Sequence, residues 1–226
     1  MRSMSKIFDL NNPVMRFLSG IADLMILNVV VTICCIPIIT IGASMTAMHY
    51  VLLKMARNEE GYIIKDFFKS FKQNFKQATI IWLIMLVFIL VFIGDYYIVM
   101  YSGIEFPKEM SVVLIVAASL LFIISTYIFP VLSRFDNTIK QTIKNGCLMS
   151  IMAAPKAIAM AVLVAVPILV TLFFPALLPL VLFLGITVPG YLSAKLYSGT
   201  FRKFEPEEEL PAPEEEFHVV FDDEEE

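Results

Sequence analysis

The chain has 226 residues, of which 58% are hydrophobic and 17% charged, and its mean hydropathy is +0.79. Soluble domains are typically about 45–50% apolar and about 25% charged, so this composition excludes an ordinary soluble protein and predicts an integral membrane protein. The net charge of −4 hides two opposite parts, because all 17 Lys and Arg lie at or before Lys203, whereas twelve of the 21 Asp and Glu lie at or after Glu205.

The residues before the first apolar stretch are polar. Lys6, Asp9 and Pro13 interrupt them, and no small-residue cleavage site follows a short apolar core. We therefore expect the first apolar segment to be retained as an anchor and not removed as a secretory signal.

The first apolar stretch, Leu18 to Ala56, is too long for a single membrane crossing. A hydrocarbon core of roughly 30 Å needs about 20 helical residues, and this stretch has 39, interrupted near its middle by Pro37 and Gly42. The pattern predicts a helical hairpin, with spans at about 18–36 and 43–56 and a tight turn at 37–42.

Four further apolar stretches follow, and each is long enough to cross the hydrocarbon core. They cover about residues 78–100, 111–133, 157–174 and 180–197. Pro167 and Pro189 predict kinks in the last two. The resulting fold class is an all-α membrane protein, a polytopic bundle of six transmembrane helices within a domain of residues 1–203.

Two basic, amphipathic segments, 57–77 and 134–156, lie between these stretches. In the first, phenylalanines recur at helical spacing with lysines between them. Such helices rest in the headgroup layer or dock on a partner. The residues predicted to dock a partner are Phe67, Phe71, Lys72, Phe75, Lys76, Lys140 and Lys144. PheLysGlnAsnPheLysGln (71–77) resembles IleLysGlnThrIleLysAsn (139–145), and an internal repeat and convergence on one membrane-surface composition both explain the match.

With six spans, the basic residues are distributed very unevenly across the membrane. Sixteen of the 17 lie on the side of the termini and the two basic segments, and Lys108 alone lies on the other. A single crossing over residues 18–56 would weaken this bias. Because cytoplasmic loops are rich in Lys and Arg, the pattern predicts that both termini lie in the cytoplasm and that the protein resides in a cell membrane.

Residues 204–226 are acidic and rich in proline, a composition that cannot form a buried core. We expect a disordered cytoplasmic tail that is solvated. Its apolar island PheHisValValPhe (217–221) is also compatible with strand addition to a partner's sheet or with docking on the chain's own basic segments.

Few ionisable side chains lie within the predicted spans, and in a bilayer such groups are functional candidates by default. They are Asp23, His49 and Asp95. A neutral His49 imidazole could relay protons or bind a solute hydroxyl near Ser44 and Thr46, but a hydrogen bond to a neighbouring helix is the favoured interpretation. The loop residues Arg134 and Asp136 complete the candidates.

Enzyme motifs are absent from the sequence. There is no GlyXaaXaaXaaXaaGlyLysSer phosphate loop, no HisGluXaaXaaHis, no GlyXaaSerXaaGly and no pair of carboxylates within the spans. Cys34, Cys35 and Cys147 lack the spacing of metal ligands. We therefore expect no enzymatic activity, no catalytic residues, no cofactor and no metal. Topology and anionic lipid explain the basic segments, so the expected partners are the lipid bilayer and other membrane proteins and do not include nucleic acid.

Three segments resemble the YesL family of bacterial membrane proteins, whose activity is unassigned. They are IleProIleIleThrIleGlyAlaSerMetThrAla (36–47), AspPhePheLysSerPheLysGlnAsnPheLysGlnAla (66–78) and ArgPheAspAsn (134–137). The resemblance covers about residues 10–203 and leaves out the acidic tail. It implies an accessory role in sugar uptake, because YesL proteins are commonly encoded beside carbohydrate ABC importers. The importer permeases' GluAlaAlaXaaXaaXaaGly coupling signature is missing, which disfavours the permease itself.

Three functional hypotheses remain. The first is a non-enzymatic membrane protein that acts as an accessory subunit or partner of a carbohydrate ABC importer. The second is an autonomous small-solute transporter or channel with a site near His49, Ser44 and Thr46. The third is a regulatory membrane module that acts through its acidic tail.

Overall fold

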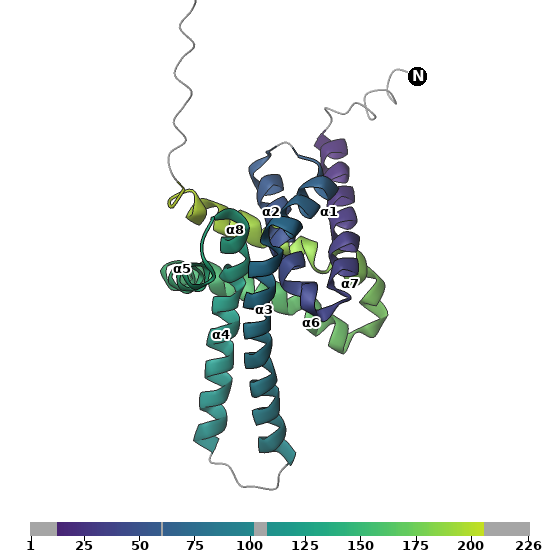
Figure 1. The fold of residues 1–226 in the computed structure, drawn as a ribbon. Coiled ribbons are helices and arrows are strands. Elements are labelled where there is room, and N and C mark those ends of the chain that lie inside the picture. Colours follow the sequence, from purple (N-terminus) through teal and green to yellow (C-terminus); the bar gives the residue numbers. More distant parts are fainter. Residues whose placement is uncertain (1–12, 60, 102–107, 206–226) are drawn as a thin grey trace, which may run out of the picture.

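The computed structural model describes residues 13–59, 61–101 and 108–205 (Figure 1). This part of the chain is helical and contains no strand. Five helical segments in it are long and apolar enough to cross a membrane, and a bent pair of helices is a further candidate. The expected class, a helical membrane protein, is therefore confirmed. The helices are α1 (Pro13–Cys35), α2 (Ile41–Arg57), α3 (Ile63–Tyr101), α4 (Lys108–Arg134), α5 (Ile139–Met152), α6 (Ala154–Phe173), α7 (Leu178–Leu184) and α8 (Thr187–Phe201).

The predicted reversal inside the first apolar stretch is present. Helix α1 ends at Cys35, a 3-10 turn covers Ile38–Thr40, and α2 begins at Ile41. The Thr40 hydroxyl donates to the carbonyls of Cys34 (2.6 Å) and Pro37 (2.8 Å). The Cys34 carbonyl is one of those that the end of α1 leaves without an intrahelical partner. The Pro37 carbonyl also accepts from the Thr40 backbone N–H at 3.0 Å, so Thr40 holds the turn.

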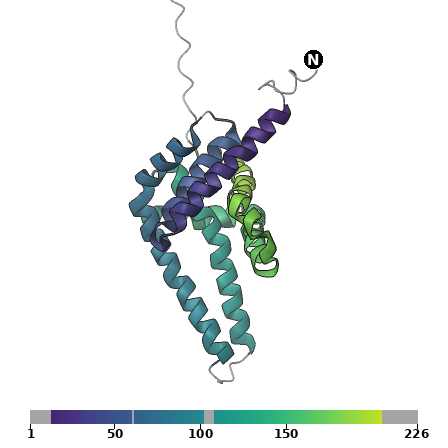
Figure 2. The same cartoon turned by 90° about the vertical axis from the view of Figure 1, so that its right-hand side faces the viewer.

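The first basic segment is not a separate surface helix. Residues 63–77 and the apolar stretch that follows form one helix, the 39-residue α3. No proline or turn sequence separates the two parts, so nothing ends the helix between them. The first half of α3 runs beside α2, and the second half projects with α4 as a long hairpin (Figures 1 and 2).

Helix α5, from the second basic segment, lies across α4 and is seen end-on in Figure 1. It begins at a capping box, in which the Thr138 side chain accepts from the Gln141 backbone and the Gln141 side chain accepts from the Thr138 backbone. Gly146 allows the close crossing, since a Cβ there would lie 3.2 Å from the Ile128 Cα.

The last apolar stretch is not one continuous span. Helices α7 and α8 meet at an angle of 52° between Leu184 and Thr187. Pro189 therefore lies in the first turn of α8, and the predicted kink is replaced by a complete break. The physical reason is that Pro189 has no N–H to bond the Gly185 carbonyl. Pro167, in contrast, stays inside α6.

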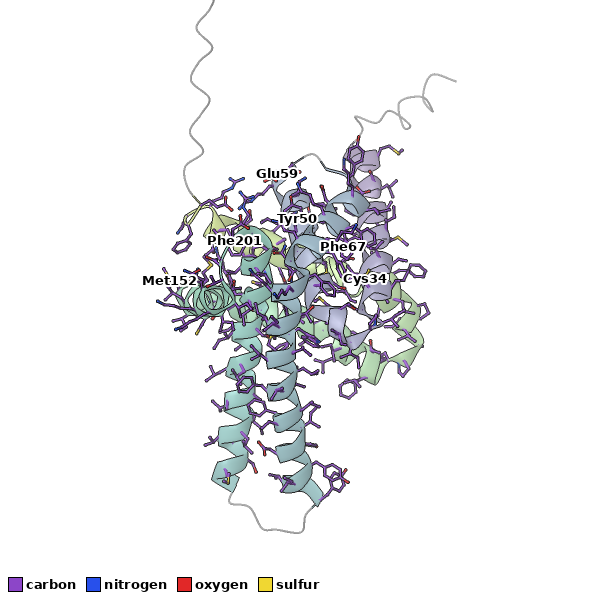
Figure 3. The ribbon with its side chains drawn as sticks, in the orientation of Figure 1. Cys34, Tyr50, Glu59, Phe67, Met152 and Phe201 are labelled. Carbon is purple, nitrogen blue, oxygen red and sulfur yellow. The ribbon has the colours of Figure 1, made fainter. Side chains whose placement is uncertain are left out.

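The hydrophobic core surrounds α2. Side chains from α1, α3, α4 and α8 pack there, and its largest fully buried members include Tyr127, Tyr197, Phe67 and Phe201. Phe67 and Phe201 lie within this body in Figure 3, whereas Met152, the last residue of α5, is 60% exposed. The projecting halves of α3 and α4 instead expose most of their large apolar side chains, such as Val87 (60%) and Val113 (65%). Such a surface suits lipid and not water.

Candidate functional site

His49 of α2 is half-buried and pairs with Tyr197 of α8. The His49 Nδ1 lies 3.2 Å from the Tyr197 hydroxyl oxygen, and that hydroxyl lies 3.4 Å from the His49 carbonyl oxygen. The two rings meet edge to face, with centroids 5.8 Å apart. This geometry is a polar contact between α2 and α8.

The other polar candidates of α2 also serve local packing. The Thr46 hydroxyl donates to the Gly42 carbonyl one turn earlier, at 2.9 Å, and Ser44 is fully buried. Asp23 and Asp95 are half-buried on α1 and on the projecting part of α3. Within the described residues, no group of three His, Cys, Asp or Glu side chains could hold a metal ion.

Asn28, which the sequence did not single out, holds the break between α7 and α8. Its side chain is fully buried. The Asn28 Nδ2 donates to the Leu182 carbonyl (2.7 Å), and its Oδ1 accepts from the backbone N–H groups of Ile186 (3.1 Å) and Thr187 (2.9 Å). Hydrocarbon offers no hydrogen-bond partner to backbone N–H and carbonyl groups, so the Asn28 side chain provides the partners that these groups need at the break. A lone Asn within an apolar run is the signal that could have found it.

Arg134, one of the predicted candidates, belongs to an ion cluster at the polar end of the molecule. Arg57 binds Glu205 through both terminal nitrogens (3.0 and 2.8 Å), and the Arg134 Nε donates to the same carboxylate at 2.8 Å. Arg57 also donates to the Ser198 hydroxyl at 3.2 Å. The cluster therefore joins the ends of α2 and α4 to α8 and the residues that follow it. Asp136 is exposed.

The electrostatics of this cluster favour a charged Glu205. Partial burial by itself raises the pKa of Glu205, but hydrogen bonds and charges from Arg57 and Arg134 outweigh it and hold the pKa below its ordinary value. The Arg57 side chain is only 6% exposed. A buried guanidinium is stable when a carboxylate faces it, so the three groups depend on one another.

The predicted docking residues fall into two groups. Phe67 is fully buried and Phe71 half-buried, and their rings stack at 5.9 Å. Phe67 is therefore not available to a partner, because at this position α3 faces the chain's own core. The remaining five are exposed: Lys72, Phe75, Lys76, Lys140 and Lys144.

An apolar crevice of about 420 Å³ separates α3 from α4. Its walls include Ile89, Phe92, Leu121 and Phe122, and Ile143 of α5 closes one end. Nearly all of its lining is aliphatic or aromatic, so it suits an acyl chain or an apolar side chain and not a hydrophilic solute.

The comparisons with known proteins give one match. Residues 21–96 match the family model described as "Protein of unknown function, DUF624". The match runs from α1 through the turn and α2 to the projecting part of α3, and YesL proteins carry this domain. No curated protein and no solved structure matches the chain.

Proposed function

We propose that this chain is a non-enzymatic accessory subunit of a carbohydrate ABC importer, with both termini in the cytoplasm of a bacterial cell. The importer as partner rests on the resemblance to YesL proteins. The contacts of the chain's polar and apolar groups support an accessory subunit and not an enzyme or a transporter.

The observation that carries the proposal is that three of the chain's polar side chains bond other parts of the same chain. His49 contacts Tyr197, Asn28 bonds three backbone groups at the α7–α8 break, and Arg57 binds Glu205. Catalytic and transport sites instead gather polar groups around an accessible pocket. A protein that works by contact with other helices needs no such pocket.

The surface offered for contact is the projecting α3–α4 hairpin. Its apolar side chains are exposed, and the crevice between the helices is open along Ile89 and Leu121. In lipid, association between helices comes from close packing and not from the hydrophobic effect. A crevice that a partner side chain or helix could fill supplies that packing.

Co-purification from native membranes tests the proposal. With an affinity tag at Met1 and a mild detergent, we expect importer subunits to co-purify with the wild-type chain. The crevice variant Ile89→Ala/Leu121→Ala should recover less of them. The matched control Leu90→Ala/Leu120→Ala changes exposed residues outside the crevice and should recover as much as wild type. Recovery of the chain without any transporter subunit would contradict the proposal.

One observation favours a second candidate, an autonomous small-solute transporter. Transport sites often lie at broken helices in the membrane, and α7 and α8 form such a break. Flux in proteoliposomes that is lost in His49→Ala would support this candidate. Absence of flux for every sugar and ion tried would remove it.

A further inference from the structure

Three contacts set the level of the α1–α2 turn along α3. Lys54 binds Asp66 at 2.8 Å, a Cβ on Gly42 would touch the Ala78 carbonyl, and the Trp82 Nε1 donates to the Ile38 carbonyl at 2.7 Å. The three contacts fit one antiparallel register, in which each residue toward the start of α2 corresponds to one residue toward the end of α3. The two helices are therefore side by side over residues 41–57 and 63–79.

This register places four lysines beside the middle of α2. Lys65, Lys69, Lys72 and Lys76 are exposed on α3, and residues 65–76 lie level with residues 44–55 of α2. If α2 crossed the hydrocarbon core from end to end, these four ammonium groups would lie in it as well. Charged groups in that position are costly unless they reach the headgroups or a water-filled cavity.

The projecting part of α3 has the length and character of a complete crossing. Twenty residues separate Lys76 from Tyr96, about 30 Å of helix and about the thickness of a hydrocarbon core. Exposed Tyr96 and Tyr97 lie near its far end, as in the aromatic belts of membrane proteins. Trp82 and the turn beside it then lie only about 9 Å past Lys76.

We infer that the α1–α2 hairpin is re-entrant, whereas α3 and α4 cross the bilayer completely. The α3–α4 hairpin therefore meets both leaflets. The turn at Ile36–Thr40 ends in the near leaflet, and the greater part of α2 lies at or above the headgroups, shielded by α1, α3, α4 and α8. Figure 2 shows that the α3–α4 hairpin continues well beyond the lower ends of α1 and α2 and that α1 lies obliquely to it.

A re-entrant α1–α2 hairpin leaves both chain termini on the side of the membrane where six spans would place them. Replacing two crossings by a re-entrant hairpin leaves an even number of crossings, so the same basic residues stay on the same side of the membrane. The distribution of Lys and Arg is therefore equal for both arrangements, and only the register of α2 against α3 distinguishes them. The inference does not depend on the importer as partner, so its test and the co-purification test can fail separately.

Cysteine labelling in intact cells tests the inference. In a variant with Cys34, Cys35 and Cys147 replaced by alanine, Ile38→Cys probes the turn and Tyr101→Cys probes the end of α3; both side chains are exposed in the structure. With a membrane-impermeant maleimide added outside, we expect Tyr101→Cys to react and Ile38→Cys to remain unlabelled. Both should react after detergent is added.

Two labelling results would overturn the inference. Reaction of Ile38→Cys from outside at the rate of Tyr101→Cys would mean that the turn reaches the far surface. With both termini in the cytoplasm, as proposed above, an unlabelled Tyr101→Cys would mean that α3 does not cross. Trp82, the one tryptophan of the chain, gives a readout without substitution. Its emission should be quenched more by phospholipids brominated at mid-chain than by aqueous iodide, and the opposite order would also overturn the inference.

Discussion

Removal of the Asn28 side chain is the sharpest test of how the broken helix is held. Asn28→Ala deletes one donor and two acceptor contacts, at 2.7, 3.1 and 2.9 Å, from a fully buried position. The backbone groups of Leu182, Ile186 and Thr187 then lose their partner. The Thr187 hydroxyl still donates to the Leu24 carbonyl at 3.0 Å, so α8 keeps one polar contact with α1.

The magnitude follows from the number of bonds lost. Hydrogen bonds between membrane helices contribute about 0.6–2 kcal/mol each, so three give about 2–6 kcal/mol. The upper part of this range applies if the freed backbone groups stay dry, because an unsatisfied buried group costs about 1–3 kcal/mol. A change of 2 kcal/mol or more is a large effect for a single substitution.

Equilibrium unfolding in mixed micelles, followed by helical circular dichroism, measures this change. The matched control is Thr32→Val on the same helix. The Thr32 hydroxyl is buried without a hydrogen-bond partner, so its removal breaks no hydrogen bond and should leave the free energy of unfolding unchanged or raise it. If Asn28→Ala were as stable as Thr32→Val, the assignment of Asn28 to the α7–α8 break would be refuted.

Three further predictions concern the helix contacts. Gly42→Ala places a Cβ 2.6 Å from the Trp82 Cβ and should destabilise the fold by about 1–3 kcal/mol. The control Gly94→Ala, at a position with open space around it, should be neutral or slightly stabilising. Equal effects of the two variants in the same unfolding assay would argue against the α2–α3 register. Tyr197→Phe removes the partner of His49 and should cost about 0.5–1.5 kcal/mol, and an unchanged free energy would mean that the pair contributes nothing. The pKa of Glu205 is lower in the folded chain than its ordinary value of 4.5, so the contribution of this carboxylate to stability is complete above pH 4.5 and is lost as the pH falls through the folded pKa. The free energy of unfolding, measured from neutral pH into acid, should therefore decline less steeply in Glu205→Gln than in wild type. Identical slopes would contradict the ion cluster of Glu205 with Arg57 and Arg134.

Local sequence signals predicted the helical class and the first reversal of the chain. Apolar stretches of sufficient length identify candidate spans without knowledge of their neighbours, and Pro37 with Gly42 marked the turn that the structure has at Ile36–Thr40. The same signals misjudged α3, because hydropathy changes at Ala78 but the helix does not end there. A change in composition is not a helix terminus when no residue interrupts the backbone hydrogen bonds.

The residues of the site were harder to predict because their partners are distant in sequence. Asn28 bonds Leu182, which lies 154 positions later, and Arg57 bonds Glu205, 148 positions later. Each residue by itself is only a polar group in or beside an apolar run. His49 was singled out for its side chain, yet the identity of its contact, Tyr197, depends on how α8 is placed after the break.

The sequence alone determined that this chain is a helical membrane protein, because total hydropathy and the lengths of apolar stretches are properties that no fold can change. It also predicts which side carries the basic residues. Only the tertiary structure decided that Phe67 faces the core, that α7 and α8 are bridged by Asn28, and that the α1–α2 turn lies beside Trp82. These depend on the relative height and rotation of packed helices, which are set by contacts between distant residues and leave no mark on local composition.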